Sequence, residues 1–337
     1  MRTAIKITRR EGMAFTLMLA VIAMIASGCS KPTYPAARIE ESVVKLCKNE
    51  YNISVRAKLQ GSTFAVYMPF ENLFDANLAL SEEASDHLND VLLSISRISL
   101  STDADLQFYI LIVQDPRIPD VQMIVIKSVD DLRKFFYGGI SRNEYFKRML
   151  YDVNFTPQAQ KEKLIKNLFV NLDIEGIDEA LDMYLRKVGI SSINDIGYWN
   201  DEFFIKDITL TEFFSKQIES RIRMEFRADK ELAEKYRVIE IVGRYDEAEE
   251  TPQFRISANI RPTKMPTPEE KTQNINDVLE ACLKVSSDVL SGYKFENFDH
   301  VEIFDNLNAS KIYVEKEALF QFSKRKMQFS DFHIQSF

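Results

Sequence analysis

Two kinds of apolar periodicity alternate along this chain, and they do so in the same order in each half. Short segments that alternate apolar and polar residues, such as 53–60, predict half-buried strands, whereas apolar residues at every third or fourth position predict amphipathic helices. The order helix, strand, strand, helix, strand, strand, helix spans 37–140 and recurs over 208–337. The sequence therefore predicts the α+β class, with two α-β-β-α-β-β-α lobes.

The predicted elements of the two lobes can be paired one to one. The tetrapeptide Asn-Asp-Val-Leu begins at Asn89 and again at Asn276, on equivalent predicted helices. An internal duplication would explain this pattern, and two generic α+β layers would be the alternative. The predicted bounds are helix 37–51, strands 53–60 and 63–69, helix 81–98, strands 106–113 and 121–127 and helix 129–137, then helix 211–236, strands 238–244 and 254–261, helix 267–290, strands 299–305 and 311–316, and a short element at 317–323.

Residues 141–207 separate the lobes and are predicted to form a mostly helical linker. Thr156 followed by proline is a typical helix start, and 177–188 has the pattern of a second helix. Trp199 is the only tryptophan of the chain. We expect it either to pack the linker onto a lobe or to act as an aromatic anchor at an interface.

The first 28 residues have the three parts of a secretory signal peptide. Residues 1–12 are basic, 13–26 are uncharged and mostly apolar, and small residues follow at Ser27 and Gly28. As a helix, the apolar part would be about 21 Å long. The hydrocarbon core of a bilayer is about 30 Å thick, so a stable membrane-spanning helix is disfavoured.

The segment Ala26-Ser27-Gly28-Cys29 resembles the lipobox of bacterial lipoproteins. The resemblance covers the leader alone, and Ala26 stands where leucine is commonest in the family. It implies removal of residues 1–28, acylation of Cys29, for example by palmitate, and a tether over 29–36 that leads to the lobes. Serine rather than aspartate after the cysteine implies sorting to the outer membrane, with the protein facing the periplasm. An ordinary cleaved signal peptide and an uncleaved anchor are the alternatives.

Cys47 and Cys282 lie on the apolar stripes of two predicted helices, so both thiols are expected in a core. They are either free buried thiols or a disulfide that joins the two ends of the chain, since an exported protein can form disulfides. The spacing of cysteine and histidine predicts no metal site.

One further segment resembles the start of the OmpA-like peptidoglycan-binding domain. The residues that carry the resemblance are 73–77 and 80–84, and it covers about forty residues of the chain. The family's ligand-binding residues find one counterpart here, Asp115, which the resemblance therefore implies as a contact for peptidoglycan. The apolar strand 121–127 departs from the family, because a helix is expected at that place.

Composition excludes several classes of function. Asp and Glu number 51 against 43 Lys and Arg, for a net charge of −8, which argues against nucleic-acid binding. Ten glycines, never clustered as phosphate-binding loops require, and three scattered histidines predict neither a nucleotide cofactor nor catalytic zinc. We therefore expect a non-enzymatic envelope lipoprotein without cofactors, with a structural, assembly or protein-interaction role and an envelope protein as partner. The alternative is a module that binds peptidoglycan or a small ligand.

Overall fold

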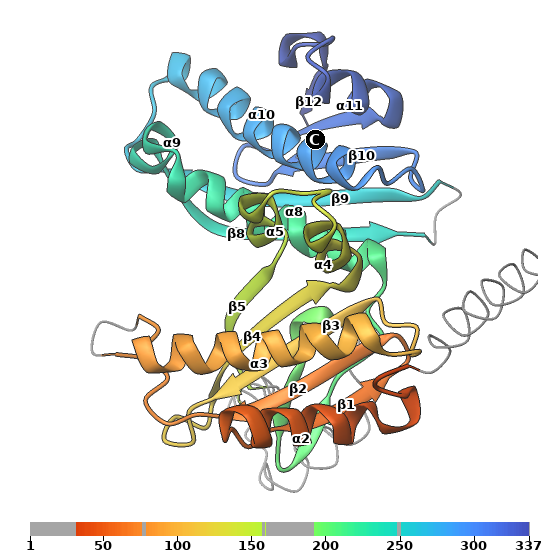
Figure 1. Cartoon of the computed structure of the whole chain (residues 1–337). Helices are drawn as coiled ribbons and strands as arrows, with labels where there is room; N and C mark the ends of the chain where they lie inside the picture. Colours follow the sequence, from red (N-terminus) through yellow and green to blue (C-terminus); the bar gives the residue numbers. More distant parts are fainter. Residues whose placement is uncertain (1–31, 76–78, 157–158, 160–191, 248–250, 337) are drawn as a thin grey trace, which may run out of the picture.

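The computed structural model describes residues 32–75, 79–156, 159, 192–247 and 251–336. Cys29, which the lipobox resemblance implies is acylated, the predicted leader and the helices expected within 157–188 lie outside the described residues. In the described part, two five-stranded mixed sheets are each packed against helices, which confirms the α+β class (Figure 1). No described helix combines the length and the apolarity that a membrane-spanning helix needs.

Lobe 1 contains the first sheet, in the order β1-β2-β3-β4-β5. Its β2–β3 pair is parallel and its other pairs are antiparallel. A short 3₁₀ helix, η1 (Ala36–Arg38), precedes the first α-helix. The elements are α2 (Ile39–Tyr51), β1 (Arg56–Gln60), β2 (Thr63–Pro69), α3 (Glu82–Ser101), β3 (Phe108–Gln114), β4 (Val121–Ser128), α4 (Val129–Phe136), α5 (Arg142–Lys147) and β5 (Leu150–Phe155).

Lobe 2 contains the second sheet, in the order β8-β9-β10-β11-β12. Here the β9–β10 pair is parallel and the other pairs are antiparallel, which repeats the pattern of lobe 1. A shared topology of this kind is what a duplication would produce; the duplication itself stays a prediction. The elements are α8 (Leu210–Ala228), α9 (Lys230–Lys235), β8 (Tyr236–Asp246), β9 (Gln253–Pro262), α10 (Pro268–Tyr293), β10 (His300–Asp305), β11 (Ser310–Glu315), α11 (Lys316–Ser323), η3 (Phe329–Asp331) and β12 (Ile334–Ser336).

The prediction of a mostly helical linker over 141–207 is wrong for the described part of that range. Residues 150–155 form β5, which pairs with β4 and completes the sheet of lobe 1. The later part forms η2 (Ile193–Asp195) and a hairpin of β6 (Gly197–Trp199) and β7 (Glu202–Phe204). Side chains of β5 alternate between more and less exposed positions, as in an edge strand. Its exposed positions carry apolar residues and two of its less exposed positions carry Asp152 and Asn154, so the sequence does not show the usual pattern of a half-buried strand.

The single helix predicted over 211–236 is in fact two helices. Helix α8 ends at Ala228, and the carboxylate of Asp229 accepts hydrogen bonds from the backbone N–H groups of Glu231 and Leu232 to start α9. On the sheet side, α8 approaches β8 closely at Gly243. A Cβ atom at this position would lie 2.4 Å from the carbonyl oxygen of Ser215, so the contact requires glycine.

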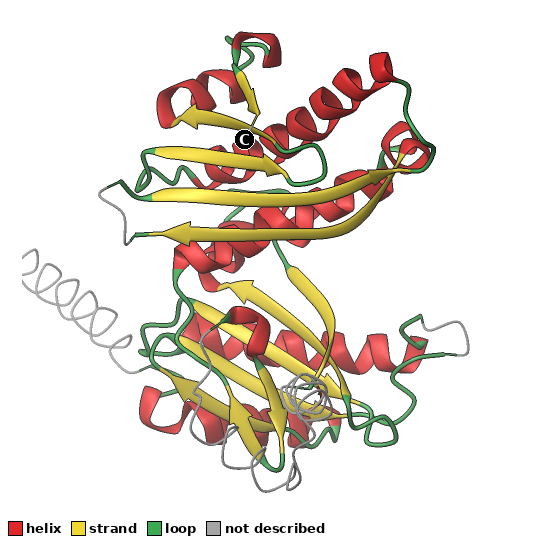
Figure 2. Ribbon diagram, turned by 180° about the vertical axis from the view of Figure 1, so that it is seen from behind, coloured by secondary structure: helices red, strands yellow, loops and turns green. Residues whose placement is uncertain are grey.

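The sheet of lobe 1 is buried on both faces. On its helix-covered face, α2 and α3 pack against side chains such as Phe64, Tyr109 and Val125 (Figure 1). On its interlobe face, the alternate residues, such as Phe108 and Ile110, share a core with lobe 2. Figure 2 shows the strands from this side, with α3 behind them. The second half of the chain therefore completes the core of the first.

Helix α8 and the β6–β7 hairpin make the contacts on the interlobe face. The ring of Phe213 in α8 lies 4.9 Å from that of Phe108 in β3. The ring of Tyr198 in β6 stacks on Tyr67 of β2 at 3.7 Å, and its backbone N–H donates to the side chain of Gln122. Of the two roles expected for Trp199, packing of the linker onto a lobe therefore belongs to its neighbour Tyr198. Trp199 itself is half-buried and packs near Phe204 of the same hairpin.

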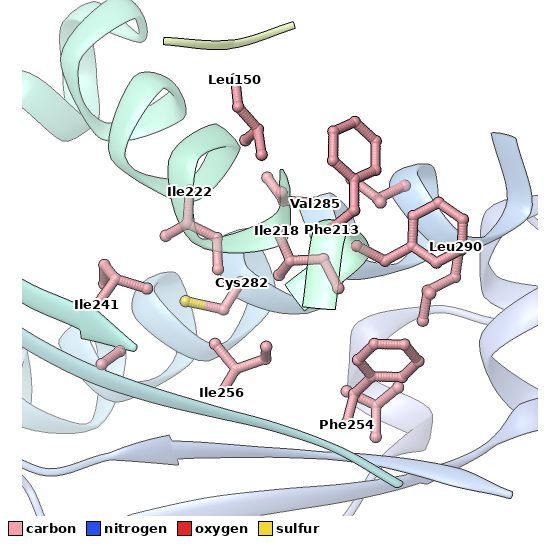
Figure 3. Close-up of a cluster of buried hydrophobic side chains, with 14 of the residues drawn as sticks. Leu150, Phe213, Ile218, Ile222, Ile241, Phe254, Ile256, Cys282, Val285 and Leu290 are labelled. Atoms are coloured by element: carbon pink, nitrogen blue, oxygen red, sulfur yellow. The ribbon is translucent and has the colours of Figure 1, made fainter. Parts of the chain in front are cut away.

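The structure contains no disulfide between Cys47 and Cys282, so that alternative is wrong. Both thiols are free and buried, and they lie in different hydrophobic clusters. Figure 3 shows Cys282 of α10 among side chains of α8, β8 and β9. Desolvation by burial raises the pKa of both thiols. The two cysteines are therefore inert core residues, as the other alternative predicted.

Candidate ligand-binding groove

The helix-covered face of the lobe 1 sheet is open over its edge strand β5, next to the buried side chains of β4. Helices α2 and α3 cover the other strands, and α4 and α5 stand at the far side, so that a groove with a cavity of about 420 Å³ lies between them. We call this the lobe 1 groove. Its walls and floor are mostly apolar and include Leu88, Leu92 and Leu93 of α3, Met123, Val125 and Lys127 of β4, Leu132, Phe135 and Phe136 of α4, Tyr145 and Phe146 of α5, and Met149 and Tyr151.

Large apolar side chains remain exposed along the rim of the groove. Phe136 is 57% exposed, Tyr151 47% and Phe146 46%. Beyond them, Val153 and Phe155 continue the apolar side chains along β5, the edge strand of the sheet. Soluble proteins rarely leave such side chains gathered on one surface unless that surface binds something.

Lys127 lies at the base of the groove with only 6% of its surface exposed. In the strand it follows Met123 and Val125 on the helix-covered face, and among the described residues no carboxylate lies within ion-pair distance of its ammonium group. Desolvation lowers the pKa of Lys127 to about 8. A lysine that is buried without a counter-charge in a cavity is a candidate for a functional residue.

Tyrosine side chains form the rest of the polar base. The ammonium nitrogen of Lys127 lies 3.4 Å from the hydroxyl of Tyr145 and 4.6 Å from the centre of its ring. The Tyr145 hydroxyl lies 3.1 Å from that of Tyr109, which in turn lies 3.5 Å from Ser96 Oγ. Burial raises the pKa of both tyrosines, so they are neutral hydroxyl groups at pH 7.

The equivalent positions of lobe 2 show that the fold does not require these polar groups. Across the lobe 1 sheet, Phe64 pairs with Tyr109 and Tyr109 pairs with Lys127. In lobe 2 the corresponding row is Phe254, Val301 and Val314, all within the hydrophobic core. Lys127 therefore occupies a position where the same topology accepts valine.

An ion pair within lobe 1, which is hydrogen-bonded to α10 of lobe 2, holds the α4–α5 wall of the groove in place. Asp131 of α4 and Arg148, just after α5, are both buried and lie 2.8 Å apart. Asp131 also accepts a 2.6 Å hydrogen bond from the hydroxyl of Tyr293 in α10, and Arg148 donates to the carbonyl oxygen of Gly292. The guanidinium group lies over the Tyr293 ring, 4.3 Å from its centre. The wall is thus attached to lobe 2 rather than to lobe 1 alone.

Two larger hollows lie elsewhere on the molecule. One, of about 960 Å³, lies between α10 and the C-terminal segment, and the other, of about 730 Å³, lies between β5 and α8. In each, the lysine pairs with an acid: Lys284 with Glu225 at 2.9 Å in the first, and Lys216 with Glu219 at 2.8 Å in the second. Neither hollow has a buried cation like Lys127.

Asp115, the contact implied by the OmpA-like resemblance, is not available to a ligand. Its carboxylate is 2% exposed and accepts hydrogen bonds from the guanidinium and backbone N–H groups of Arg117 and from the N–H of Leu73. The bonds from the Arg117 guanidinium hold the pKa of Asp115 well below its usual range. The residue therefore fastens the turn between β3 and β4. Asp115 is also absent from the residues that line the lobe 1 groove.

Lys127 is the residue that sequence reasoning missed. It stands at the end of an apolar strand, where a lysine usually marks the exit to solvent. One signal was present in the sequence. Lys127 is two residues after Val125 and four after Met123, so its side chain points to the same, buried face of the strand.

No known protein family, curated protein or solved structure matches the chain. In the part of the chain that the structure describes, no three His, Cys, Asp or Glu side chains gather as metal ligands would.

Proposed function

We propose that the protein is a lipid-anchored lipoprotein of the bacterial envelope that binds an apolar envelope component in the lobe 1 groove, without catalysis. The resemblance of residues 26–29 to a lipobox supports the anchor at Cys29. The observation that carries the binding role is the open groove with exposed aromatic side chains at its rim.

The exposed apolar surface and the volume of the groove both favour ligand binding at this site. Each large apolar side chain that a ligand covers contributes up to about 1.5–3 kcal/mol to the free energy of binding. The exposed side chains at the rim can therefore stabilise a complex with an apolar ligand. The cavity of about 420 Å³ falls within the range of roughly 300–1,000 Å³ that is common for ligand sites. The ion pair of Asp131 with Arg148 holds one wall in place, which reduces the entropic cost of binding.

Site-specific photo-crosslinking in intact cells tests this proposal. A photoreactive phenylalanine analogue at Phe136 or at Tyr151 should capture one defined envelope component. The matched control is Tyr313 on the outer face of the lobe 2 sheet, which is 42% exposed against 47% for Tyr151. Equal or absent adducts at the groove and control positions would contradict the proposed role.

A further inference from the structure

We infer that the ligand of the lobe 1 groove is a single apolar chain that ends in a carboxylate, such as a long-chain fatty-acid anion, and that Lys127 pairs with this carboxylate. The inference rests on the proposed function, because it takes the groove as the binding site. It adds the chemical class of the ligand and the residue that recognises it.

The charge of Lys127 is the first argument. Its ammonium group is largely removed from water, and the nearby groups that replace water are a tyrosine hydroxyl at 3.4 Å and two aromatic rings, those of Tyr145 and Phe146. These are weak substitutes for hydration, because a buried charge is normally paired. A ligand carboxylate would supply the missing counter-charge.

The position of Lys127 limits the shape of what can reach it. Only 6% of the residue is exposed, at the base of a groove bounded by Leu92 on one side and Phe135 on the other. An α-helix with its side chains is about 10–12 Å across. A helix would rest on the rim, whereas one extended acyl chain can lie between the exposed side chains of Phe136, Phe146 and Tyr151 and bring its end to the lysine.

The polar groups at the base suit a carboxylate better than a phosphate. Of the two charged residues that line the groove in the described part of the chain, Lys127 is the one cation and Asp90 the one acid, and the Tyr145 hydroxyl beside the lysine can donate to the second oxygen of a monoanion. A phosphate group has more oxygens and more charge, and it is usually held by several cationic or backbone donors. The structure therefore favours a free acid over a phospholipid headgroup.

Lobe 2 provides an internal comparison for this argument. Where lobe 1 has Tyr109 and Lys127, lobe 2 has Val301 and Val314 in a closed core. The polar base is thus specific to the lobe that has the open apolar groove, which is what recognition of a ligand requires.

The test is calorimetric titration of the mature protein at pH 7 with hexadecanoate, hexadecanol and hexadecyltrimethylammonium, each below its aggregation concentration. We expect hexadecanoate to bind roughly 10-fold or more tightly than hexadecanol, since a charge-assisted hydrogen bond contributes about 1.5–3 kcal/mol. The cationic amphiphile should bind most weakly. Lys127→Met should abolish the preference for the acid while it leaves the affinity for hexadecanol unchanged.

Two further variants separate the inference from the proposed function. Phe136→Asp, at the exposed rim, should weaken binding of the acid and the alcohol alike, and Lys48→Met, on an exposed face of α2, should change neither. Binding of acid and alcohol with equal affinity, or a preference for the acid that survives Lys127→Met, would overturn the inference. No binding of hexadecanoate would overturn it too. In either case, specific crosslinks from Phe136 or Tyr151 would still support the groove as the binding site.

Discussion

The two lobes have the same strand order but bury their sheets differently. The lobe 2 sheet packs one face on α8 and α10, and its other face carries paired charges, such as Arg255 with Glu302 at 3.1 Å and Lys311 with Glu302 at 3.3 Å. The lobe 1 sheet is apolar on both faces, one of which is completed by α8 and the β6–β7 hairpin. The comparison shows that one topology can serve as a self-sufficient layer or as a layer that needs a partner.

The largest expected effect follows from this dependence. A fragment of residues 32–156 would expose the interlobe face, including Tyr67, Phe108 and Ile110, and would lose on the order of 10 kcal/mol, which is comparable to the whole stability of a domain. We expect it to show no cooperative unfolding transition by circular dichroism. A fragment of residues 192–337 keeps α8 on its own sheet and should retain a transition. Cooperative unfolding of the first fragment would show that lobe 1 is independent.

The second effect concerns the ion pair of Asp131 with Arg148, whose hydrogen bonds to α10 connect lobe 1 to lobe 2. Arg148→Met would leave the buried carboxylate of Asp131 with Tyr293 as its hydrogen-bond donor, so we expect a loss of about 3–5 kcal/mol in the free energy of unfolding by urea denaturation. Lobe 2 has Ala318 at the place in α11 that corresponds to Asp131 in α4. Arg148→Met combined with Asp131→Ala should therefore cost less than the sum of the single changes. Additive costs would mean that the two side chains do not act as a pair.

The third expected effect is an increase in stability rather than a loss. Because Lys127 is buried with a pKa lowered to about 8 from the ordinary 10.5, its charged form costs roughly 2–3 kcal/mol in the folded protein at pH 7. Lys127→Met, which keeps the length of the side chain, should raise the free energy of unfolding by about that amount. Val314→Lys at the equivalent position of lobe 2 should lower it by a similar amount or more.

The pH dependence of this difference identifies its cause. Between about pH 8 and 10.5 the unfolded chain binds a proton at Lys127 that the folded chain has lost, so the wild type gains stability as the pH rises. The advantage of Lys127→Met should therefore shrink across this window and vanish above it. Urea denaturation of both proteins from pH 7 to 10.5 measures the difference. A constant advantage at every pH would assign the effect to packing instead of charge.

The α+β class and most elements of both lobes could be predicted from the sequence, because these strands and helices carry their own periodicity. Strand β5 could not, because Asp152 and Asn154 interrupt its apolar residues and its pairing with β4 is a long-range contact. The same holds for the interlobe face: Phe213 belongs to an ordinary amphipathic stripe, and nothing local shows that it will contact Phe108 of the other lobe.

The candidate site was hidden for a related reason. The burial of Lys127 is produced by α4 and α5 folding over the end of β4, and these helices are placed by contacts with lobe 2 through Arg148. The sequence was searched for clustered acids and histidines, whereas the polar groups at the base of the groove are a lysine, two tyrosines and a serine. The one indication in the sequence is that Lys127 alternates with apolar residues that point to the core, which predicts that its side chain is buried.

The smallest expected effect compares the turns that follow the third strand of each sheet. Asp115 in lobe 1 has a pKa held below its usual range by Arg117, whereas burial raises the pKa of Asp305 in lobe 2. The Asp115 carboxylate therefore contributes stability that is present at neutral pH and is lost as the pH falls below about 4, while protonation of Asp305 favours the folded state. Asp115→Asn should cost about 1–2 kcal/mol at pH 7, because Arg117 is half exposed, and progressively less as the pH falls below about 4.

Asp305→Asn tests the other half of this comparison. The Asp305 carboxylate accepts hydrogen bonds from the N–H groups of Leu307 and Asn308, which an asparagine oxygen can also accept. Since the folded protein binds a proton at Asp305 more readily than the unfolded chain, the variant should lose the stability that the wild type gains there on acidification. Thermal unfolding of both variants between pH 3 and 7 should thus give slopes that deviate from the wild type in opposite directions. Equal deviations would show that the two turns, despite their different partners, hold their carboxylates in the same way.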